Sequence, residues 1–399
     1  IRADGQYIVH NGNEEIVNVP AAEVTEGFLY DRPYEVRKNN FTEPHLSEPV
    51  DYNQVFLDIL SHENMASREP IFEQYDKQVQ GRSFTETGLA DSGVLAPFNS
   101  EKYPEEIRNV GIALSTDHNP RHGLISPYWG GVNAVVEAMR NVTAVGATPH
   151  AITDCLCFGN PENPHQMWEF VESVRGVADA CHAITLKDNP NDATPIIAGN
   201  VSFYNESKTG AIPPSPIVSC LGKLKDVNKT IPMAFQKTDS ILLMVGKRKD
   251  ECGGSVYYSL YGELGANVPK PNLEEVKNQI FALTDCIDNG LILSSHDIAD
   301  GGIASSIAEM TFGNEIACEV TISGEMSKDK LLFSETGGFV LEVTSENIDA
   351  VKNTFFKYGL GIDAIGRTIV QPSLVINDVI NLSVRKAKEA WTNGLREKL

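Results

Sequence analysis

Hydrophobic positions along the chain follow two spacings, and each spacing predicts a type of element. Short stretches alternate apolar and polar residues, which is typical of strands, while longer stretches repeat apolar residues every three or four positions, as amphipathic helices do. Because the two kinds alternate through most of the chain, we predict an α+β protein. The expected strands are 7–9, 16–19, 110–116, 150–158, 195–197, 240–245, 291–295 and 339–343. The expected helices are 55–60, 132–145, 164–181, 273–287, 303–310 and 383–399.

The first fifty residues differ from the rest. Asn11-Gly12 stands between two alternating stretches, which is a strong short-range signal for a β-hairpin. The segment that follows, to about residue 50, is rich in Pro, Glu and Arg without periodicity, which predicts a tether crossing a surface. The first residue is Ile1 rather than Met. We therefore expect residues 1–46 to be the tail of a preceding domain and a linker, in a fragment of a longer protein.

A proline-rich joint, Ile212–Pro216, divides the remaining chain. Clustered prolines interrupt both helices and strands, so this joint predicts a domain boundary. We predict one domain at 47–212, a second at 213–375 and a C-terminal tail helix at 376–399, which suits a chain of 399 residues.

Composition and charge narrow the class of protein. Hydrophobic content of 41% and charged content of 22% are those of a soluble globular protein, and no apolar run approaches the roughly 18 residues of a membrane span. The net charge of −21 repels phosphate backbones, which argues against nucleic acid and anionic membranes as partners. Seven cysteines fit a reducing cytoplasm better than a disulfide framework, and Cys155 with Cys157 supplies too few ligands for zinc.

The stretch from Pro195 to Glu206 joins an apolar run to a polar cluster. Its first three residues predict a buried strand, and the small residues Ala198 and Gly199 let backbone N–H groups approach an anion closely. The polar side chains that follow are Asn200, Ser202, Tyr204, Asn205 and Glu206. The stretch predicts a phosphate-binding loop, with a Gly-Asn turn that only closes the strand as the alternative.

Polar residues also mark other predicted strands, and the ends of strands are well placed for binding ligands. One group lies on or after the strands in the first half of the chain: Asp117, Asn119, Asp154 and Asn160. A second group follows the strand 291–295: His296, Asp297, Asp300, Gly301 and Gly302.

Gly130 and Gly131 come just before the apolar positions of the helix 132–145. Two glycines at a helix N-terminus expose N–H groups beside the positive end of the helix dipole, which predicts an anion site. The alternative is a plain turn into a packed helix.

Five of these stretches, in order, resemble the synthetase subunit of phosphoribosylformylglycinamidine synthase, also called formylglycinamide ribonucleotide amidotransferase. The resemblance is carried by Thr116–Arg121, Pro127–Gly131, Ala151–Asp154 with Phe158–Pro161, Gly199–Glu206 and His296–Gly302. That family duplicates a two-domain unit found also in aminoimidazole ribonucleotide synthetase. The resemblance implies an N-type domain, whose sheet forms a barrel on pairing, followed by a C-type α/β sandwich domain, in the C-terminal half of the family's chain.

The resemblance implies an ATP-dependent carbon–nitrogen ligase of purine biosynthesis. ATP phosphorylates the amide oxygen of formylglycinamide ribonucleotide, and ammonia from a glutaminase partner displaces the phosphate to form the amidine. The expected cofactors are ATP and Mg²⁺. The expected partners are the N-terminal half, the glutaminase subunit and a small bridging subunit, with a homodimer through the N-type domain as a further pairing. The segment around His118 resembles the family's catalytic His segment only superficially, so we assign no catalytic residue and expect the fragment to be inactive alone.

The resemblance also distributes roles among the residues named above. Substrate or phosphate binding falls on Gly199, Asn200, Ser202, Tyr204, Asn205, Glu206, His296, Asp297, Asp300, Gly301 and Gly302. The residues expected to bind the nucleotide are Asp117, Asn119, Gly130, Gly131, Asp154 and Asn160. Asp154 is expected to bind the metal ion, with Asp117 assisting. Two positions depart from the family pattern: Ala198 stands where a Gly is usual, and Cys157 stands where an Asn is usual.

Two alternatives remain open. In the first, this half is a scaffold that docks partner subunits and holds a nucleotide that is never turned over. In the second, the chain is an independent kinase-like relative that pairs with a second copy of itself. The kinase-like relative would turn over ATP without any other half.

Overall fold

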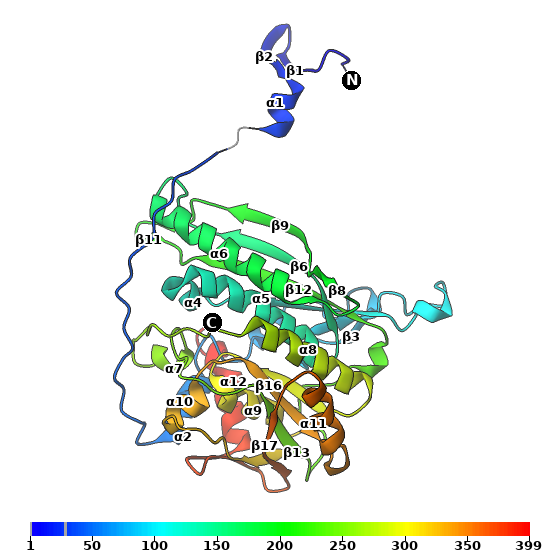
Figure 1. The fold of residues 1–399 in the computed structure, drawn as a ribbon, viewed down its shortest axis with the longest axis vertical. Helices are drawn as coiled ribbons and strands as arrows, with labels where there is room; N and C mark the ends of the chain where they lie inside the picture. Colours follow the sequence, from blue (N-terminus) through cyan, green and yellow to red (C-terminus); the bar gives the residue numbers. More distant parts are fainter. Residues whose placement is uncertain (1, 28–29) are drawn as a thin grey trace.

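The computed structural model describes residues 2–27 and 30–399. Its N-terminal hairpin consists of β1 (Gln6–Asn11) and β2 (Glu14–Pro20), followed by the short helix α1 (Ala21–Glu26), and it stands apart from the body (Figure 1). Gly12 adopts φ +63° in the turn, a conformation that favours glycine. The hairpin predicted around Asn11-Gly12 is confirmed.

Residues 30–50 contain no helix or strand and run along the body. Arg37 pairs with Glu169 of the first domain, and Asn39 Nδ2 donates to the carbonyl of Ile125 at 2.8 Å. Further along, Glu43 Oε1 accepts the backbone N–H of Ala266, in the second domain, at 2.8 Å. The predicted tether is confirmed, and it is bonded to both domains.

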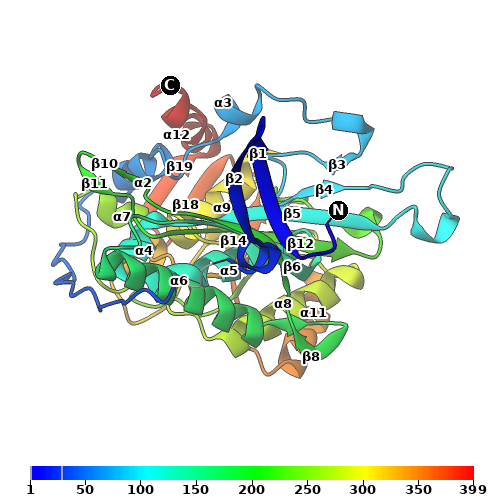
Figure 2. The same cartoon turned by 90° about the horizontal axis from the view of Figure 1, so that it is seen from above.

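The first domain is a six-stranded sheet in the order β3-β4-β5-β12-β6-β9, antiparallel except for the β6–β9 pair. The strands are β3 (Ser83–Thr85), β4 (Gly93–Leu95), β5 (Gly111–Asp117), β12 (Ser215–Leu224), β6 (Thr148–Cys157) and β9 (Ile196–Ser202). The helices packed on it are α4 (Pro120–Ile125), α5 (Pro127–Ala144) and α6 (Pro164–Ala183). Figure 2 shows these helices on one side of the sheet.

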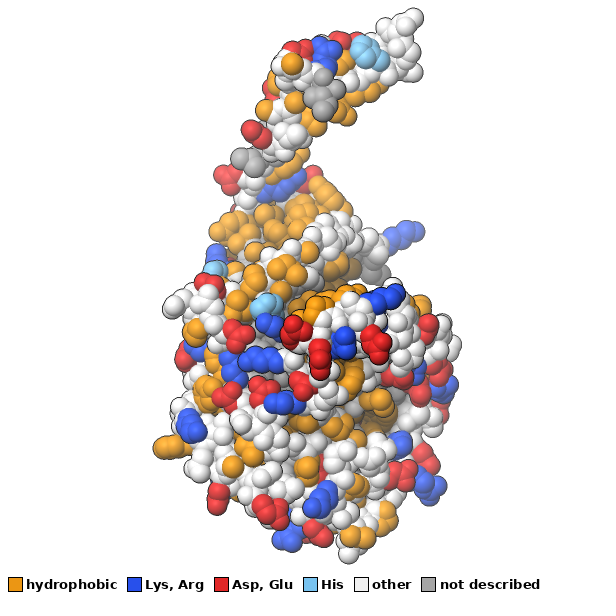
Figure 3. Space-filling model, turned by 90° about the vertical axis from the view of Figure 1, so that its right-hand side faces the viewer, with side chains coloured by type: hydrophobic (Ala, Val, Ile, Leu, Met, Phe, Trp, Pro, Cys, Tyr) orange, Lys and Arg blue, Asp and Glu red, His pale blue; other side chains and the backbone are white. Residues whose placement is uncertain are grey.

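The other face of this sheet, here called the open face, carries exposed apolar side chains. Leu114 of β5 is 52% exposed, and Leu95 of β4, on the same face, is 44% exposed. Figure 3 shows hydrophobic side chains gathered in the upper part of the body, below the hairpin. The buried strand predicted at 195–197 is wrong in its burial, because Ile196 and Ile197 are 45% and 59% exposed on the edge strand β9. The apolar run in the sequence is the same whether other parts of this chain or a partner protein cover the strand, so the run alone does not predict burial within this chain.

The second domain is a seven-stranded sheet in the order β14-β16-β13-β17-β15-β18-β19 with helices on both faces. The strands are β14 (Ser294–Ile298), β16 (Gly338–Val343), β13 (Ile241–Val245), β17 (Ile362–Ile369), β15 (Ala317–Val320), β18 (Ser373–Ile376) and β19 (Ile380–Ser383). One face packs on α9 (Gly302–Phe312), α12 (Val384–Arg396) and α2 (Tyr52–Leu60), and the other on α8 (Leu273–Asp288) and α11 (Ile348–Lys357). The sandwich expected for this domain is therefore present.

The remaining short elements connect these layers. They are α3 (Glu69–Phe72), β7 (Thr185–Leu186), β8 (Asn189–Ala193), β10 (Glu206–Ser207), β11 (Gly210–Ala211), α7 (Val256–Ser259) and α10 (Lys328–Phe333). Within the ranges that the structure describes, every helix falls short of the length and apolarity that crossing a membrane requires.

Two domain boundaries differ from the prediction. The strand after the proline-rich joint, β12, lies inside the first sheet, where Val218 pairs with Asp117 of β5 and with Asp154 of β6. The first domain therefore extends to residue 224, not 212. At the other end, α2 packs on the second domain, with the ring of Phe56 stacked 6.3 Å from that of Phe333. Both corrections come from pairing between segments that are distant in sequence.

Replacing Gly302 by alanine is expected to lower the free energy of unfolding by about 3 kcal/mol. Gly302 adopts φ +70°, and a Cβ there would lie 2.6 Å from the carbonyl oxygen of Leu332 and 2.7 Å from that of Ser334. Gly290→Ala is the matched control, because Gly290 adopts φ +67° with no atom within 4 Å of the added Cβ. The control should lose only about 1 kcal/mol in urea denaturation; equal losses would contradict the steric argument.

Candidate functional site

A cleft of about 750 Å³ opens between the two domains. The first domain contributes residues of α5 and of the loop before β4, and the second contributes β14, α9 and α12. Acidic side chains gather along this cleft: Asp91, Glu137, Asp297, Asp300 and Glu309. Asp117, at the end of β5, lies beside them within hydrogen-bonding reach of Glu137.

Burial disfavours the charged form of Asp117, Glu137 and Asp297. Burial and then the charge of Asp300 raise the pKa of Asp117 to about 8. Burial and then the charge of Asp117 raise the pKa of Glu137 well above its usual range. For Asp297, burial and the charge of Asp91 raise the pKa to about 7. Because like charges repel strongly where water is excluded, this cluster favours either protonation or a bound cation.

His296 lies between two of these acids. Its Nδ1 is 2.8 Å from Asp91 Oδ1, and its Nε2 is 3.2 Å from Glu309 Oε2. Burial opposes a charge on the ring, yet the charges and hydrogen bonds of Asp91 and Glu309 raise the pKa of His296 well above its usual value. Both ring nitrogens are engaged, so His296 acts here as a fixed positive charge rather than as a group with a free nitrogen for substrate.

The strand that carries His296 and Asp297 is shifted from its predicted position. β14 begins at Ser294 rather than at Leu291, so both residues lie within the strand and not after it. Leu293 N–H bonds to the carbonyl of Glu342, and the regular ladder with β16 starts only at the next residue. Pairing with β16 decides where the strand starts, and the apolar run does not reveal that pairing.

The cleft fits the Mg²⁺ that the resemblance implies. Asp91, His296 and Asp297 each present a ligand atom within 4.8 Å of the others. Asp297 Oδ2 is buried without a hydrogen-bond partner, while its backbone N–H donates to Asp91 Oδ2 at 2.9 Å. Mg²⁺ prefers carboxylate oxygens, and since His296 is already bonded on both sides, Asp91 and Asp297 are the groups suited to hold the ion, with Glu137 on the same cleft wall.

Asp154 lies outside this cluster. Asp154 and Asp117 pair with Val218 from opposite sides, so their backbones are two strand spacings apart, about 9.6 Å. Burial raises the pKa of Asp154, and a Cβ on Gly199 would overlap its carboxylate. The predicted metal pair of Asp154 with Asp117 is therefore not brought together; the acids that are brought together line the cleft.

Three of the predicted phosphate-loop residues lie along the edge strand β9. Gly199, Asn200 and Ser202 pair in parallel register with Asp154, Cys155 and Cys157. Because side chains alternate along a strand, Asn200 and Ser202 share one face, and the register with Cys155 and Ile217 makes this the open face.

The other residues of this stretch hold the loop together. Asn205 Nδ2 donates to the carbonyls of Phe158 and Ser202 at 3.0 and 2.8 Å. The hydroxyl of Tyr204 donates to Glu162 at 3.0 Å, and Asn160 Oδ1 accepts the Glu162 N–H at 2.9 Å. The side chains of Asn205, Tyr204 and Asn160 thus have structural partners, whereas Glu206 is exposed in β10.

Gly130 and Gly131 serve packing, which corrects the expectation of an anion site. The helix begins three residues earlier, at Pro127, and the N–H of Gly130 already donates to the carbonyl of Ser126 at 2.8 Å. A Cβ on Gly131 would overlap the carbonyl of Ser173 on α6. The absence of side chains lets α5 and α6 approach closely.

The turn at Gly301 joins the cleft to a second buried acid, Glu335. The N–H of Gly301 donates to Glu335 Oε1 at 2.9 Å, and Asn119 Nδ2 donates to Asp300 Oδ1 at 3.3 Å. Burial, and then the charge of Asp300, raise the pKa of Glu335 to about 8. Burial lowers the pKa of His118, the residue before Asn119 in the chain, to about 4, so this ring is neutral.

Sequence reasoning missed several acids of the cleft. Asp91 and Glu309 were not singled out, and Glu137 lies within the apolar positions of α5, between Val136 and Met139. A carboxylate in a run of buried valines is a signal that could have identified Glu137, because an acid is rarely buried without a role. Asp91 carries no such signal, since it precedes a glycine in a turn-like stretch.

Comparisons with known proteins agree with this two-domain architecture. Residues 91–224 match the family described as AIR synthase related protein, N-terminal domain, and residues 237–379 match AIR synthase related protein, C-terminal domain. The chain belongs to the AIR synthase related family. Among curated members of this family, subunit PurL of phosphoribosylformylglycinamidine synthase from Methanothrix thermoacetophila is 44% identical over 98% of this chain and 51% of its own length. The corresponding subunit of Methanocaldococcus jannaschii is 35% identical over 95% of this chain and 51% of its own length.

These matches confirm the predicted resemblance to PurL subunits, and the chain spans about half the length of the curated relatives it matches. Solved structures agree on the fold. Thermotoga maritima PurL complexed with FGAR has a TM-score of 0.65 at 18% identity and covers 86% of this chain and 54% of its own. The same protein complexed with ATP has a TM-score of 0.60 at 18% identity, with coverages of 84% and 52%.

Proposed function

We propose that this chain is the C-terminal half of a PurL-type phosphoribosylformylglycinamidine synthase and is completed by the N-terminal half. The observation that carries the proposal is the open face, where Leu114 and Leu95 remain exposed although helices cover the opposite face. Sheet faces with exposed apolar side chains mark interaction sites, and the PurL relatives have about as much additional chain as this chain itself, enough for a second two-domain unit.

The proposed activity of the complete protein is ATP-dependent conversion of formylglycinamide ribonucleotide to its amidine, with ammonia from a glutaminase subunit. Thermotoga maritima PurL complexed with FGAR and the PurLQS assembly of the same organism support this substrate and further subunits for the relative. In this chain Asn200 and Ser202 lie on the open face, beside Gly199, so their side chains are placed to contact a phosphate held between the two halves. Backbone N–H groups beside a glycine suit an anion.

The interdomain cleft is proposed as a second nucleotide site, in which ATP or ADP is bound through Mg²⁺ and is not turned over. Mg²⁺ would supply the positive charge that a polyphosphate needs beside buried acids. The ion would be held by Asp91, Asp297 and Glu137. The hydrogen bond from Asn119 keeps the carboxylate of Asp300 oriented beside them. A nucleotide that is bound but not turned over also fits the scaffold hypothesis, because the Mg²⁺ and nucleotide held by the acidic cleft would stabilise this chain without catalysis.

The decisive experiment measures ADP release from Mg-ATP, formylglycinamide ribonucleotide and ammonium, with this chain alone and with the N-terminal half of the same protein. We expect turnover only in the mixture. Turnover by this chain alone would overturn the proposal and favour the independent kinase-like enzyme. No turnover in the mixture, although the two halves associate in gel filtration, would leave the scaffold role.

A further inference from the structure

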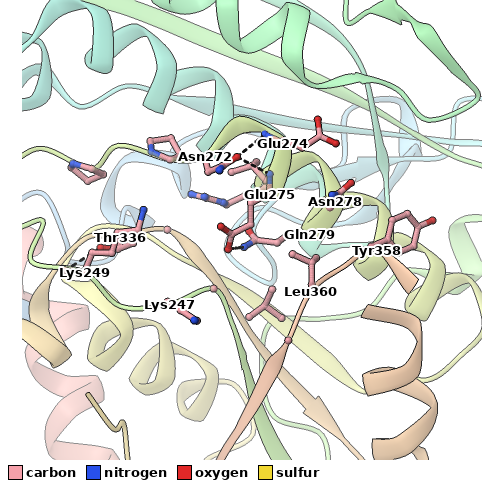
Figure 4. Close-up of a pocket in the computed structure, with 18 of the residues that line it drawn as sticks. Lys247, Lys249, Asn272, Glu274, Glu275, Asn278, Gln279, Thr336, Tyr358 and Leu360 are labelled. Atoms are coloured by element: carbon pink, nitrogen blue, oxygen red, sulfur yellow. Dashed lines mark hydrogen bonds between the residues drawn. The ribbon is translucent and has the colours of Figure 1, made fainter. Parts of the chain in front are cut away.

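A second cavity, of about 580 Å³, shares no lining residue with the interdomain cleft (Figure 4). It is bounded by α5, the segment after β13, the start of α8 and the loops before β16 and β17. In Figure 4, Lys247, Lys249 and Thr336 lie on one side of it, and Glu275 and Gln279 on the other. Its volume lies within the range of small-molecule sites, about 300 to 1,000 Å³.

Arg140 of α5 lines this cavity without a hydrogen bond or ion pair to the described residues, although the carboxylates of Asp297, Glu137, Glu275 and Glu251 act on its charge from a distance. The residue is only 6% exposed, its Nε is buried without a hydrogen bond, and its guanidinium makes neither a hydrogen bond nor an ion pair within 4 Å among residues 2–27 and 30–399. Gly337 leaves room for it, since a Cβ there would overlap Arg140 Nη1. A buried charge without a partner is costly, and an anion in the cavity would provide the missing partner.

A second cation and a second unpaired group face the same space. Lys247 is exposed on the segment after β13 and has no hydrogen bond or ion pair with the described residues. Gln279 is 4% exposed; its Nε2 donates to Glu275 Oε1 at 3.2 Å, and its Oε1 is buried without a donor. The cavity therefore offers two free positive charges and one free acceptor.

Most acids of the lining already have partners. Glu251 accepts the N–H of Lys270 at 3.1 Å and the hydroxyl of Thr336 at 2.9 Å, and Glu274 pairs with Lys277 at 2.6 Å. These carboxylates are thus occupied by protein donors, which leaves Arg140 and Lys247 free for a ligand. A guanidinium beside an ammonium suits a phosphate group, which accepts several charge-assisted hydrogen bonds at once.

We propose that this cavity binds a small phosphate monoester, with its phosphate on Arg140 and Lys247 and a hydroxyl or amine of its organic part on Gln279 Oε1. The site is separate from the acidic cleft and from the β9 edge, and it does not depend on the proposed ligase activity. A sugar phosphate and a nucleoside monophosphate share the required chemistry.

The test is isothermal titration of the full chain in EDTA, so that metal-dependent binding in the cleft is suppressed. The probes are inorganic phosphate, ribose 5-phosphate and AMP, with ribose and adenosine as uncharged counterparts. We expect one of the two phosphate esters to bind at least about tenfold more tightly than its uncharged counterpart and more tightly than inorganic phosphate. The better ester identifies the organic part, whereas equal weak binding of all probes would overturn the proposal.

Variants distinguish binding in this cavity from nonspecific attraction of the phosphate to positive charge on the protein surface. Lys247→Glu should weaken the phosphate ester at least about tenfold, while Lys352→Glu, the same charge change on the exposed face of α11, should leave it unchanged. Gln279→Leu should weaken the ester but not inorganic phosphate, because only the ester reaches Oε1. Equal effects of the two lysine variants, or no effect of either, would overturn the assignment; both lysines are exposed, so neither change threatens the fold.

Discussion

Leu114→Glu is expected to weaken association with the N-terminal half about a hundredfold while leaving this chain folded. Leu114 lies in the middle of β5 on the open face and is 52% exposed, and Leu221 of β12 lies beside it in register. In the chain alone the new carboxylate is solvated, so the free energy of unfolding should change by less than about 0.5 kcal/mol. Against an apolar partner surface the same carboxylate would be buried without a partner, at about 3 kcal/mol or more.

That penalty corresponds to about a hundredfold weaker association. The measurement is ADP release in the mixture of halves as a function of the concentration of the N-terminal half. Val370→Glu is the matched control, because Val370 is 77% exposed between β17 and β18, away from the open face. Wild-type activity of Leu114→Glu at every concentration would show that the open face is not the interface, and would leave the N-terminal half to bind elsewhere.

Asp297→Asn is expected to stabilise the metal-free chain and to remove most of its stabilisation by Mg²⁺. The carboxylate is buried beside Asp91, and its Oδ2 has no hydrogen-bond partner. Asparagine keeps the shape and removes the charge, so repulsion from Asp91 falls and the melting temperature should rise by a few degrees. A metal ligand is lost at the same time, so the midpoint of Mg²⁺ stabilisation should move at least about tenfold higher in concentration.

Melting curves with increasing Mg²⁺ test both halves of this prediction. Asp349→Asn, an exposed acid at the start of α11, controls for the change in net charge and should keep the wild-type response. Asp154→Asn run in parallel decides between the two metal assignments. If that variant loses the Mg²⁺ response while Asp297→Asn retains it, the ion belongs at the β9 edge and the cleft assignment is wrong.

Local signals in the sequence predicted the elements that local chemistry specifies. Asn163 and Asn272 cap α6 and α8, each accepting N–H groups of the first turn, because a side-chain oxygen there satisfies donors that the helix cannot. Gly12 and Gly290 end their elements with positive φ. The first turn of α6 has no capping box, since Gln166 accepts the N–H of Asn160 from the preceding loop instead. A tertiary contact replaced the local one.

The candidate site was only partly visible in the sequence. His296, Asp297 and Asp300 were placed near the cleft from their motif, but their partners Asp91 and Glu309 lie far from them or carry no pattern of their own. Asp91 is 205 residues from His296 along the chain. Hydrophobic periodicity extends over the length of one helix or strand, so it cannot reveal a contact between residues this far apart in the sequence.

By itself, the sequence determined the hairpin, the helices, the α+β class and, through ordered motifs, the family to which the chain belongs. Only the tertiary structure decided that β12 crosses back into the first sheet, that β9 is an exposed edge, that Gly130 and Gly131 pack helices and that acids from both domains share one cleft. The physical reason is range: caps, turns and periodicity act within a few residues, whereas strand order, burial and the repulsion among buried charges depend on which distant segments come together.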